Sequence, residues 1–243
     1  MLKTSNVSKS FGGIQAVKNV TFELIPKEIL GLIGPNGAGK TTLFNLIAGV
    51  YKPNSGSILF KEMDIAGMRP HWICNLGIAR TFQIVKPFPS LTVLQNVMLG
   101  SRFGKNRELF YRQDFSKRAK ECLHFVGFEQ KKDLPCEALN YGEIKRVELA
   151  RALATQPEIL LLDEVIAGLN PVETEEMMHL IQRIRAELKV TILMIEHVMK
   201  AIMGISDRVI VLHHGEMITQ GRPSEVVQNQ KVIDAYLGER VVE

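Results

Sequence analysis

Residues 29–41 read I-L-G-L-I-G-P-N-G-A-G-K-T, and this stretch decides the fold. Its first five residues are apolar or glycine, as in a buried strand, and residues 41–48 fit a helix. The segment between them, residues 34–41, matches the pattern G-x-x-x-x-G-K-[ST]. Glycines in such a loop let successive amide hydrogens point at a phosphate, and the following helix adds the positive end of its dipole. The sequence therefore predicts a phosphate-binding loop between a strand and a helix.

The side chains of this loop indicate which phosphate ligand it holds. Lys40 is placed to neutralise the β- and γ-phosphates of a nucleoside triphosphate, and the Thr41 hydroxyl to bind Mg²⁺. ATP and Mg²⁺ are therefore the expected ligands. The predicted ATP-binding residues of this region are Gly34, Pro35, Asn36, Gly37, Ala38, Gly39, Lys40, Thr41 and Thr42.

Two adjacent acids end a second apolar run. Residues 159–162 are I-L-L-L, and Asp163 and Glu164 follow directly. In a parallel sheet the carboxyl ends of the strands open onto the ligand crevice, so these acids should face the phosphates. Adjacent side chains on a strand point to opposite faces, so the two carboxylates should have different roles. We assign Asp163 to Mg²⁺ and Glu164 to the attacking water, as general base.

Apolar runs and helix-period stretches alternate through most of the chain, which indicates βαβ units, an α/β fold and a mainly parallel sheet. Near the start, residues 2–7, 14–22 and 28–33 read as three short strands of a small antiparallel layer. Between residues 87 and 155 the strand pattern gives way to helix periodicity, which predicts an inserted helical lobe.

Helix periodicity also predicts individual segments. Apolar residues recur at helix spacing in residues 115–126, and Asn170-Pro171 predicts the start of another helix. The apolar face expected for that second helix consists of Met177, Leu180, Ile181, Ile184 and Leu188. The remaining predicted elements are strands over residues 190–195 and 208–212, a hairpin turn at His213-His214-Gly215, and a helix over residues 231–237.

The composition of the 243 residues is that of a globular protein, with 46% hydrophobic and 23% charged residues. No apolar run approaches the roughly 18 residues that cross a bilayer, and the first residues lack the apolar core of a secretory signal. Three cysteines, with no C-x-x-C spacing, point to a reducing cytosol. The net charge of +4 is spread along the chain, whereas nucleic-acid binders concentrate their basic residues. No nucleic-acid partner is therefore expected.

A third segment narrows the choice among the families of phosphate-loop ATPases. Residues 139–143 read L-N-Y-G-E and resemble the signature motif L-S-G-G-Q of ABC (ATP-binding cassette) proteins. Asn140 replaces its Ser, Tyr141 its first Gly and Glu143 its Gln, while Gly142 is kept. The resemblance implies that these four residues contact the ATP of a second subunit. A helix that begins near Tyr141 would offer free backbone amides to a γ-phosphate.

Two further segments indicate a subgroup. With R-T-F-Q at residues 80–83 and A-G-L-N at residues 167–170, the chain resembles the ATP-binding subunits of branched-chain amino acid importers. The resemblance implies that Gln83 senses Mg²⁺ and the attacking water and touches the transmembrane partner. It also implies that Gly168 and Asn170 belong to the loop that crosses to the second subunit.

The remaining family positions match single residues. His197 follows the predicted strand at residues 190–195 and matches the switch histidine that contacts the γ-phosphate. Phe11 matches the aromatic residue that stacks on adenine, and Val17 the residue beside the ribose, although both could simply be core residues.

The implied fold class is α/β: a P-loop NTPase (RecA-like) core with a mainly parallel sheet, an N-terminal antiparallel β layer and an inserted α-helical subdomain. Residues 1–243 are expected to form a single ABC ATPase domain. Within it, residues 1–86 and 156–243 would be the nucleotide-binding core, and residues 87–155 the inserted subdomain with the signature.

The implied function is ATP binding and hydrolysis that energises the import of small solutes, with branched-chain amino acids first. Other amino acids, urea or amides, lipopolysaccharide export, a nucleic-acid-handling ABC protein and a nucleotide-regulated scaffold stay open as alternatives. The implied partners are a second ATP-binding subunit, in a homodimer or heterodimer, transmembrane permease subunits and, indirectly, a solute-binding protein. The implied location is cytoplasmic, peripheral on the cytoplasmic face of the cell membrane.

Overall fold

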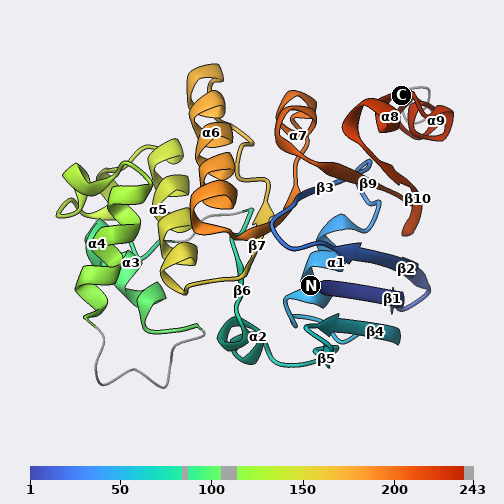
Figure 1. Cartoon of the computed structure of the whole chain (residues 1–243), viewed down its shortest axis with the longest axis horizontal. Helices are drawn as coiled ribbons and strands as arrows, with labels where there is room; N and C mark the ends of the chain where they lie inside the picture. The colour runs from blue at the N-terminus through green and yellow to red at the C-terminus, as the bar shows by residue number, and fades with distance from the viewer. Residues whose placement is uncertain (84–86, 105–113, 238–243) are drawn as a thin grey trace. The chain divides into compact units, whose positions relative to one another are not determined.

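A computed structural model describes residues 1–83, 87–104 and 114–237 (Figure 1). It divides into two compact units, residues 1–70 with 191–243 and residues 71–190. Both contain parallel strands and helices, so the predicted α/β class is confirmed. The subdomain division at residues 87 and 155 stays a prediction, and its segment 105–113 lies outside the described residues.

An antiparallel sheet forms one layer of the first unit. Its strands, in the order β2-β1-β4-β5, are β1 (Leu2–Phe11), β2 (Ile14–Leu24), β4 (Ser55–Phe60) and β5 (Met63–Asp64). Leu2 faces Leu24 on one side and Phe60 on the other, and all three side chains are buried. The predicted N-terminal antiparallel layer is therefore confirmed for its first two strands.

The third strand predicted for that layer lies elsewhere. β3 (Ile29–Ile33) pairs in parallel with β8 (Thr191–Ile195) and β9 (Arg208–His213), and β10 (Glu216–Gly221) is antiparallel to β9. Every residue of β3 and β8 is buried, as in parallel strands that are covered on both faces. The prediction that residues 28–33 belong to the antiparallel layer was wrong, and β4 takes that place.

Helices complete the first unit. α1 (Lys40–Ile47) buries Leu43, Phe44, Leu46 and Ile47, and the other helices are α7 (Met199–Ile205), α8 (Pro223–Val227) and α9 (Gln230–Leu237). Between β9 and β10 the chain turns at His214 and Gly215, which both have positive φ. The predicted hairpin turn and the predicted helix at residues 231–237 are confirmed.

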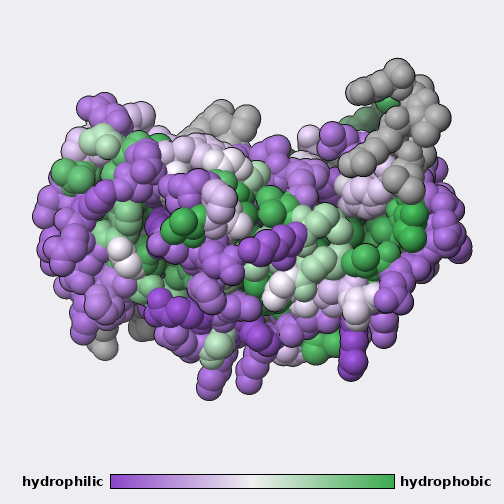
Figure 2. Space-filling model, turned by 90° about the horizontal axis from the view of Figure 1, so that it is seen from above, coloured by the Kyte–Doolittle hydropathy of each residue, from purple (hydrophilic) through white to green (hydrophobic). Residues whose placement is uncertain are grey.

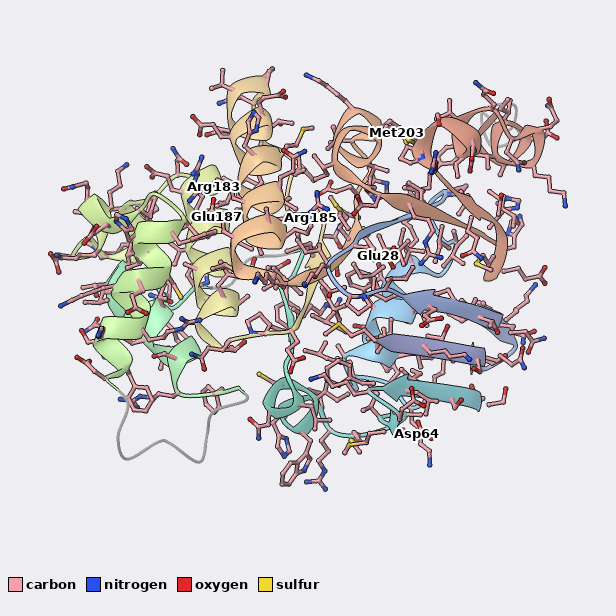
Figure 3. The ribbon with its side chains drawn as sticks, viewed as in Figure 1. Glu28, Asp64, Arg183, Arg185, Glu187 and Met203 are labelled. Carbon is pink, nitrogen blue, oxygen red and sulfur yellow. The ribbon has the colours of Figure 1, made fainter. Side chains whose placement is uncertain are left out.

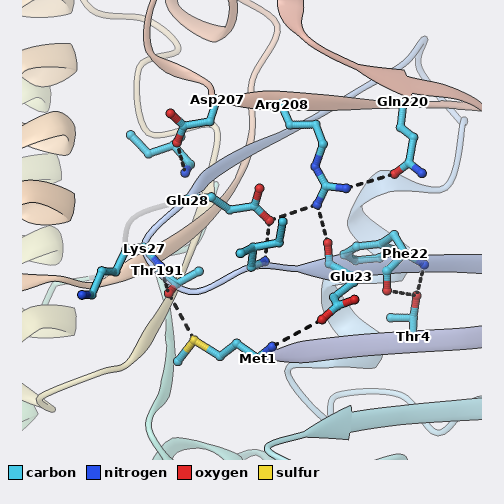
Figure 4. A network of polar contacts seen from close by, with 12 residues as sticks. Met1, Thr4, Phe22, Glu23, Lys27, Glu28, Thr191, Asp207, Arg208 and Gln220 are labelled. Carbon is cyan, nitrogen blue, oxygen red and sulfur yellow. Dashed lines mark hydrogen bonds and ion pairs between the residues drawn. The ribbon is translucent and has the colours of Figure 1, made fainter.

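A polar network ties the start of β3 to β9 and β2 (Figure 4). The Arg208 guanidinium donates to the Glu28 carboxylate over 3.0 Å and to the main-chain carbonyl of Glu23. Asp207 accepts a hydrogen bond from the Ile29 amide over 2.8 Å. Buried polar groups that are paired in this way fix the register of a strand. The network therefore holds the strand from which the phosphate loop departs.

The second unit is mostly helical. Its strands β6 (Ile78–Arg80) and β7 (Ile159–Asp163) are parallel, and helices α3, α4 and α5 pack against one another. Its helices are α2 (Pro70–Leu76, from His71 onward), α3 (Val93–Ser101), α4 (Phe115–Phe125), α5 (Tyr141–Ala154) and α6 (Pro171–Leu188), with short 3₁₀ turns η2 (Glu129–Lys131) and η3 (Cys136–Ala138).

The apolar face predicted for helix α6 can be compared with the burial of its residues. Four of its five predicted residues are buried, but Leu188, the last residue of the helix, is 43% exposed. The helix ends at Leu188, and Lys189 adopts the left-handed conformation, so the last residue of the helix is not packed in the core. Along the same helix, Arg183 pairs with Glu187 over 2.8 Å (Figure 3).

Within residues 1–83, 87–104 and 114–237, no helix is both long and apolar enough to cross a membrane. Hydrophilic residues cover much of the face drawn in Figure 2, with hydrophobic residues among them.

Candidate functional site

The phosphate loop occupies residues 34–40, between β3 and α1 in the first unit. Gly34 has φ +150°, and a Cβ there would lie 2.1 Å from the Leu212 carbonyl oxygen. Gly39 has φ +99°, and a Cβ there would lie 2.2 Å from the Ala16 carbonyl oxygen. Both positions therefore require glycine for the conformation and for the close approach of another backbone.

Lys40 is buried and folds back over its own loop. Its ammonium donates to the carbonyl oxygens of Gly34 and Pro35 over 2.6 and 2.8 Å. No acidic side chain lies in the first turn of α1, and no side chain caps its N-terminus. The start of this helix therefore keeps amides and a positive dipole end for an anion.

The hydroxyl residues of the loop lie at the start of the helix. Thr41 is exposed and Thr42 half-buried, and both belong to the first turn of α1. Asn36 and Gly37 are exposed at the tip of the loop, whereas Ala38 is buried. The described geometry thus suits the predicted phosphate ligand, and the individual contacts to ATP stay predictions.

The two residues predicted beside the nucleoside differ in exposure. Phe11, at the end of β1, is 43% exposed and stacks edge-on against Tyr51 with a centroid distance of 5.1 Å. Val17 is fully buried in the core of the first unit. An exposed ring can stack on a base, whereas Val17 presents no side-chain surface to a ribose. Both assignments stay predictions.

The acid pair lies at the end of β7 in the second unit. Asp163, the last residue of the strand, is buried, and its carboxylate accepts a hydrogen bond from Arg80 over 2.7 Å. The Asp163 amide also donates to the Thr81 hydroxyl over 3.2 Å. A buried carboxylate needs such a partner, because a lone charge in the interior is costly.

Glu164 lies just beyond the strand rather than on it. Its φ is +52°, a left-handed conformation that is unusual for a residue with a side chain. Its carboxylate accepts a hydrogen bond from the Gln83 amide over 2.8 Å. The two acids thus have different partners, Arg80 for Asp163 and Gln83 for Glu164, and their different roles stay a prediction.

The signature residues form the start of α5. Asn140 caps the helix by accepting from the Glu143 amide over 2.9 Å, and the Glu143 carboxylate accepts from the Asn140 amide over 3.0 Å. Glu143 also pairs with Lys131. Burial acts to raise the pKa of Glu143, but the bonds from Lys131 and Asn140 outweigh it and lower that pKa. The negative charge of Glu143 therefore has a cation beside it.

The loop after the acids ends in a second capped helix. Asn170 caps α6 by accepting from the amides of Val172 and Glu173 over 2.9 and 3.0 Å. Gly168 has φ +78°, and a Cβ there would lie 3.1 Å from the Tyr141 ring. The structure therefore brings the predicted crossing loop against the predicted signature residue Tyr141.

His197 belongs to the first unit, between β8 and α7, and is exposed. It follows the carboxyl end of a parallel strand, which is the position expected for a residue that reaches the ligand crevice. Its contact with a γ-phosphate stays a prediction.

Sequence reasoning assigned no role to three charged residues of the second unit: Lys145 and Glu148, which are buried, and Arg80, which is part-buried. Lys145 donates to main-chain oxygens of the loop after β7, and Glu148 accepts from the Phe82 amide over 3.0 Å. Burial raises the pKa of Glu148 to about 6. The available signal for Lys145 and Glu148 was the presence of charged residues among the apolar residues of a helix, because charged residues are rarely buried without a partner.

The three residues predicted to bind Mg²⁺, Thr41 in the first unit and Gln83 and Asp163 in the second, carry oxygen donors. The Thr41 hydroxyl, the Gln83 amide oxygen and the Asp163 carboxylate are hard ligands, and a carboxylate can accept from Arg80 and still bind a cation or its water. Within the described parts of the chain, no three His, Cys, Asp or Glu side chains form a dedicated metal cage. Mg²⁺ needs none, because it usually keeps water and uses substrate phosphates as ligands.

Two family models match the chain. The first, described as "ABC transporter", covers residues 17–167 and so includes the phosphate loop, the acid pair and the signature segment. The second, described as "Branched-chain amino acid ATP-binding cassette transporter", covers residues 216–242.

Similar proteins agree with these matches. The high-affinity branched-chain amino acid transport ATP-binding protein LivG of Escherichia coli (strain K12) is 42% identical over 98% of both chains. A solved structure of the ADP conformation of MJ1267, an ATP-binding cassette of an ABC transporter, is 31% identical over 98% of both chains with a TM-score of 0.88. The dimeric post-hydrolysis state of the cassette MJ0796, bound to ADP and Pi, is 28% identical over 92% of this chain and 99% of that one, with a TM-score of 0.80.

Proposed function

This chain belongs to the ABC transporter family, and from that membership we propose that it is the ATP-binding and ATP-hydrolysing subunit of a branched-chain amino acid importer. The observation that carries the proposal is the 42% identity with a transport ATP-binding protein for these amino acids over 98% of both chains. The second family match, at residues 216–242, supports the same substrate class.

The phosphate loop binds the triphosphate of ATP. Lys40 exchanges its bonds to the Gly34 and Pro35 carbonyls for phosphate oxygens, and the open amides at the start of α1 add further donors. Phe11 stacks on the adenine. Thr41, Gln83 and Asp163 would hold Mg²⁺, which would neutralise charge on the phosphates.

Hydrolysis depends on Glu164. Its carboxylate takes a proton from the attacking water, and Gln83, already bonded to it, orients that carboxylate. His197 donates to the γ-phosphate, where negative charge develops. The chemistry is mostly positioning and charge stabilisation, so the loss of Glu164 stops turnover without stopping binding.

A second ATP-binding subunit completes the active form. The start of α5, with Asn140, Tyr141, Gly142 and Glu143, caps the ATP of that subunit, and Gly168 and Asn170 lie in the loop that reaches it. Because Lys131 offsets the Glu143 charge, this helix start is better suited to a phosphate than the sequence alone indicates.

The remaining partners are membrane permease subunits and, through them, a solute-binding protein. The chain acts as a peripheral subunit on the cytoplasmic face of the cell membrane. The substrate is tested by purifying the complex, reconstituting it in liposomes and measuring ATP-dependent uptake of labelled leucine against labelled urea. Uptake of leucine is expected; uptake of urea alone would refute the substrate class.

The ATPase assignment is tested with Glu164→Gln. We expect the variant to bind ATP, to lose hydrolysis by about 10²- to 10⁴-fold, as for removal of a general base, and to form a stable dimer with ATP and Mg²⁺. Size-exclusion chromatography and phosphate release measure the two effects. The double variant Lys40→Ala/Glu164→Gln is the control and should stay monomeric. A Glu164→Gln monomer that still hydrolyses ATP would refute the assignment.

A further inference from the structure

Lys145 is a buried lysine on α5, four residues after Tyr141. Only 1% of its surface is exposed, although lysine is almost never fully buried unless it is paired. A buried ammonium costs several kcal/mol unless hydrogen bonds compensate for the lost water. The surroundings of Lys145 should therefore supply specific partners.

Two main-chain oxygens and an aromatic ring meet the ammonium. Lys145 Nζ donates to the carbonyl oxygens of Glu164 and Ala167 over 2.8 and 2.6 Å. It also lies 4.8 Å from the centroid of the Tyr141 ring, within the range of a cation–π contact. Charge-assisted hydrogen bonds of this kind are about twice as strong as neutral ones. Lys145 therefore holds both ends of the turn at residues 164–167.

That turn carries the residue assigned to the attacking water. Glu164 has φ +52°, and the left-handed conformation is unfavourable for a residue with a side chain. Such a conformation persists where the surroundings fix it. Within the turn, the Ala167 amide donates to the Glu164 carbonyl over 3.3 Å. The two bonds from Lys145 are shorter and carry a charge.

The same helix also holds the partner of Glu164. One turn after Lys145, the Glu148 carboxylate accepts from the Phe82 amide over 3.0 Å, directly before Gln83. The Gln83 amide in turn donates to the Glu164 carboxylate over 2.8 Å. The backbone on both sides of the Glu164–Gln83 contact is thus held by charged side chains of α5.

We propose that Lys145 is a positioning residue for ATP hydrolysis: its ammonium fixes the backbone of Glu164 so that the carboxylate faces the attacking water. The proposal rests on the proposed ATPase function and deepens it. In this role Lys145 acts through the backbone of Glu164 and exchanges no proton. A misplacement of about 1 Å at a catalytic group can cost on the order of 10²-fold in rate, which sets the size of the expected effect.

Three variants of the full-length chain test the proposal. Lys145→Met keeps the length of the side chain and removes the donor, Lys145→Arg keeps a charged donor, and Lys120→Met changes an exposed lysine of α4 in the same unit. ATP hydrolysis, the affinity for a fluorescent ATP analogue and thermal unfolding are measured for each, with Glu164→Gln as the inactive reference.

For Lys145→Met we expect kcat to fall on the order of 10- to 100-fold while KM and ATP affinity stay within about twofold. Lys145→Arg should recover most of the lost kcat, and Lys120→Met should match the parent. A purely structural role predicts a different result, in which affinity and thermal stability fall together with kcat and Arg does not rescue; that outcome, or an unchanged kcat, overturns the proposal.

If Lys145→Met does not fold, the proposal is tested by Lys145→Arg alone. It keeps a charged donor for the carbonyls of Glu164 and Ala167, so it should fold with kcat within about threefold of the parent, and a folded Arg variant as slow as Glu164→Gln overturns the proposal. A failure of the proposed function is recognised separately: the parent chain itself would then lack any hydrolysis that Glu164→Gln removes, and the Lys145 proposal would fall with it.

Discussion

The phosphate loop at residues 34–40 follows one buried strand, and the second loop, at residues 164–170, follows another that ends at Asp163, yet the two are held by different means. The first is shaped mainly by its own residues, with glycines in conformations that only glycine accepts and Lys40 bonded to the loop's carbonyls; from outside, the Gly215 amide donates to the Ala38 carbonyl over 3.1 Å. The second is held by side chains from other segments: Gln83, Lys145 and, at the strand end before it, Arg80. A loop of the first kind is recognisable as a sequence pattern, whereas a loop of the second kind is not.

The largest effect should come from Gly39→Ala, which disturbs the backbone conformation of the phosphate loop. The new Cβ would lie 2.2 Å from the Ala16 carbonyl oxygen at φ +99°, so the loop must move. We expect the free energy of unfolding to fall by about 3 kcal/mol and ATP binding to be lost. Urea unfolding and titration with a fluorescent ATP analogue measure both quantities.

Gly13→Ala is the matched control for this substitution. Gly13 has no positive φ, and a Cβ there would have nothing within 4 Å. The control should therefore bind the analogue like the parent. If Gly39→Ala also bound it with parental affinity, the loop would not depend on its own backbone, and the contrast between the two loops would be wrong.

The same contrast explains how far the sequence predicts this molecule. The G-x-x-x-x-G-K-[ST] pattern, the strand-end acids and the Asn-Pro helix start are local, and each led to the correct element. The pairing of β3 was mistaken, because an apolar run does not say which strands lie beside it. Arg80, Lys145 and Glu148 were missed because their partners lie 83, 19 and 66 residues away in the sequence.

A smaller effect should appear when a side chain near the second loop is neutralised. Burial raises the pKa of Glu148 from its ordinary value of 4.5 to about 6, against the opposing effects of the Phe82 amide, Arg151 and Lys145; Asp163 adds to the rise. The folded state therefore binds the proton more tightly than the unfolded state. The stabilisation that protonated Glu148 gives to the folded state is fully present below pH 4.5 and is lost as the pH rises through about 6.

Glu148→Gln removes this titration and keeps an oxygen to accept from the Phe82 amide. As the pH rises from 4.5 to 7, the unfolding free energy of the variant should increase relative to that of the parent by up to about 2 kcal/mol. This is the free energy that corresponds to a pKa raised from 4.5 to about 6. Urea unfolding of the nucleotide-free protein at both pH values measures the change. Glu121→Gln, at an exposed position of α4, controls for the removal of a carboxylate. A difference from the parent that does not vary with pH would contradict the prediction.

The smallest effect concerns the residue where the second loop ends. Asn170 caps α6 through two amides, so Asn170→Ala should cost about 1 kcal/mol of unfolding free energy, while Asn170→Asp, which can accept the same bonds, should cost little. Urea unfolding without nucleotide separates this effect from any role in dimer contact. Equal losses for Ala and Asp would mean that the cap does not hold the loop end. A loss of stability in Asn170→Ala alone would show that the second loop also depends on one local contact, the cap of α6. That contact is the part of the loop that the sequence predicts, because an Asn-Pro pair marks a helix start.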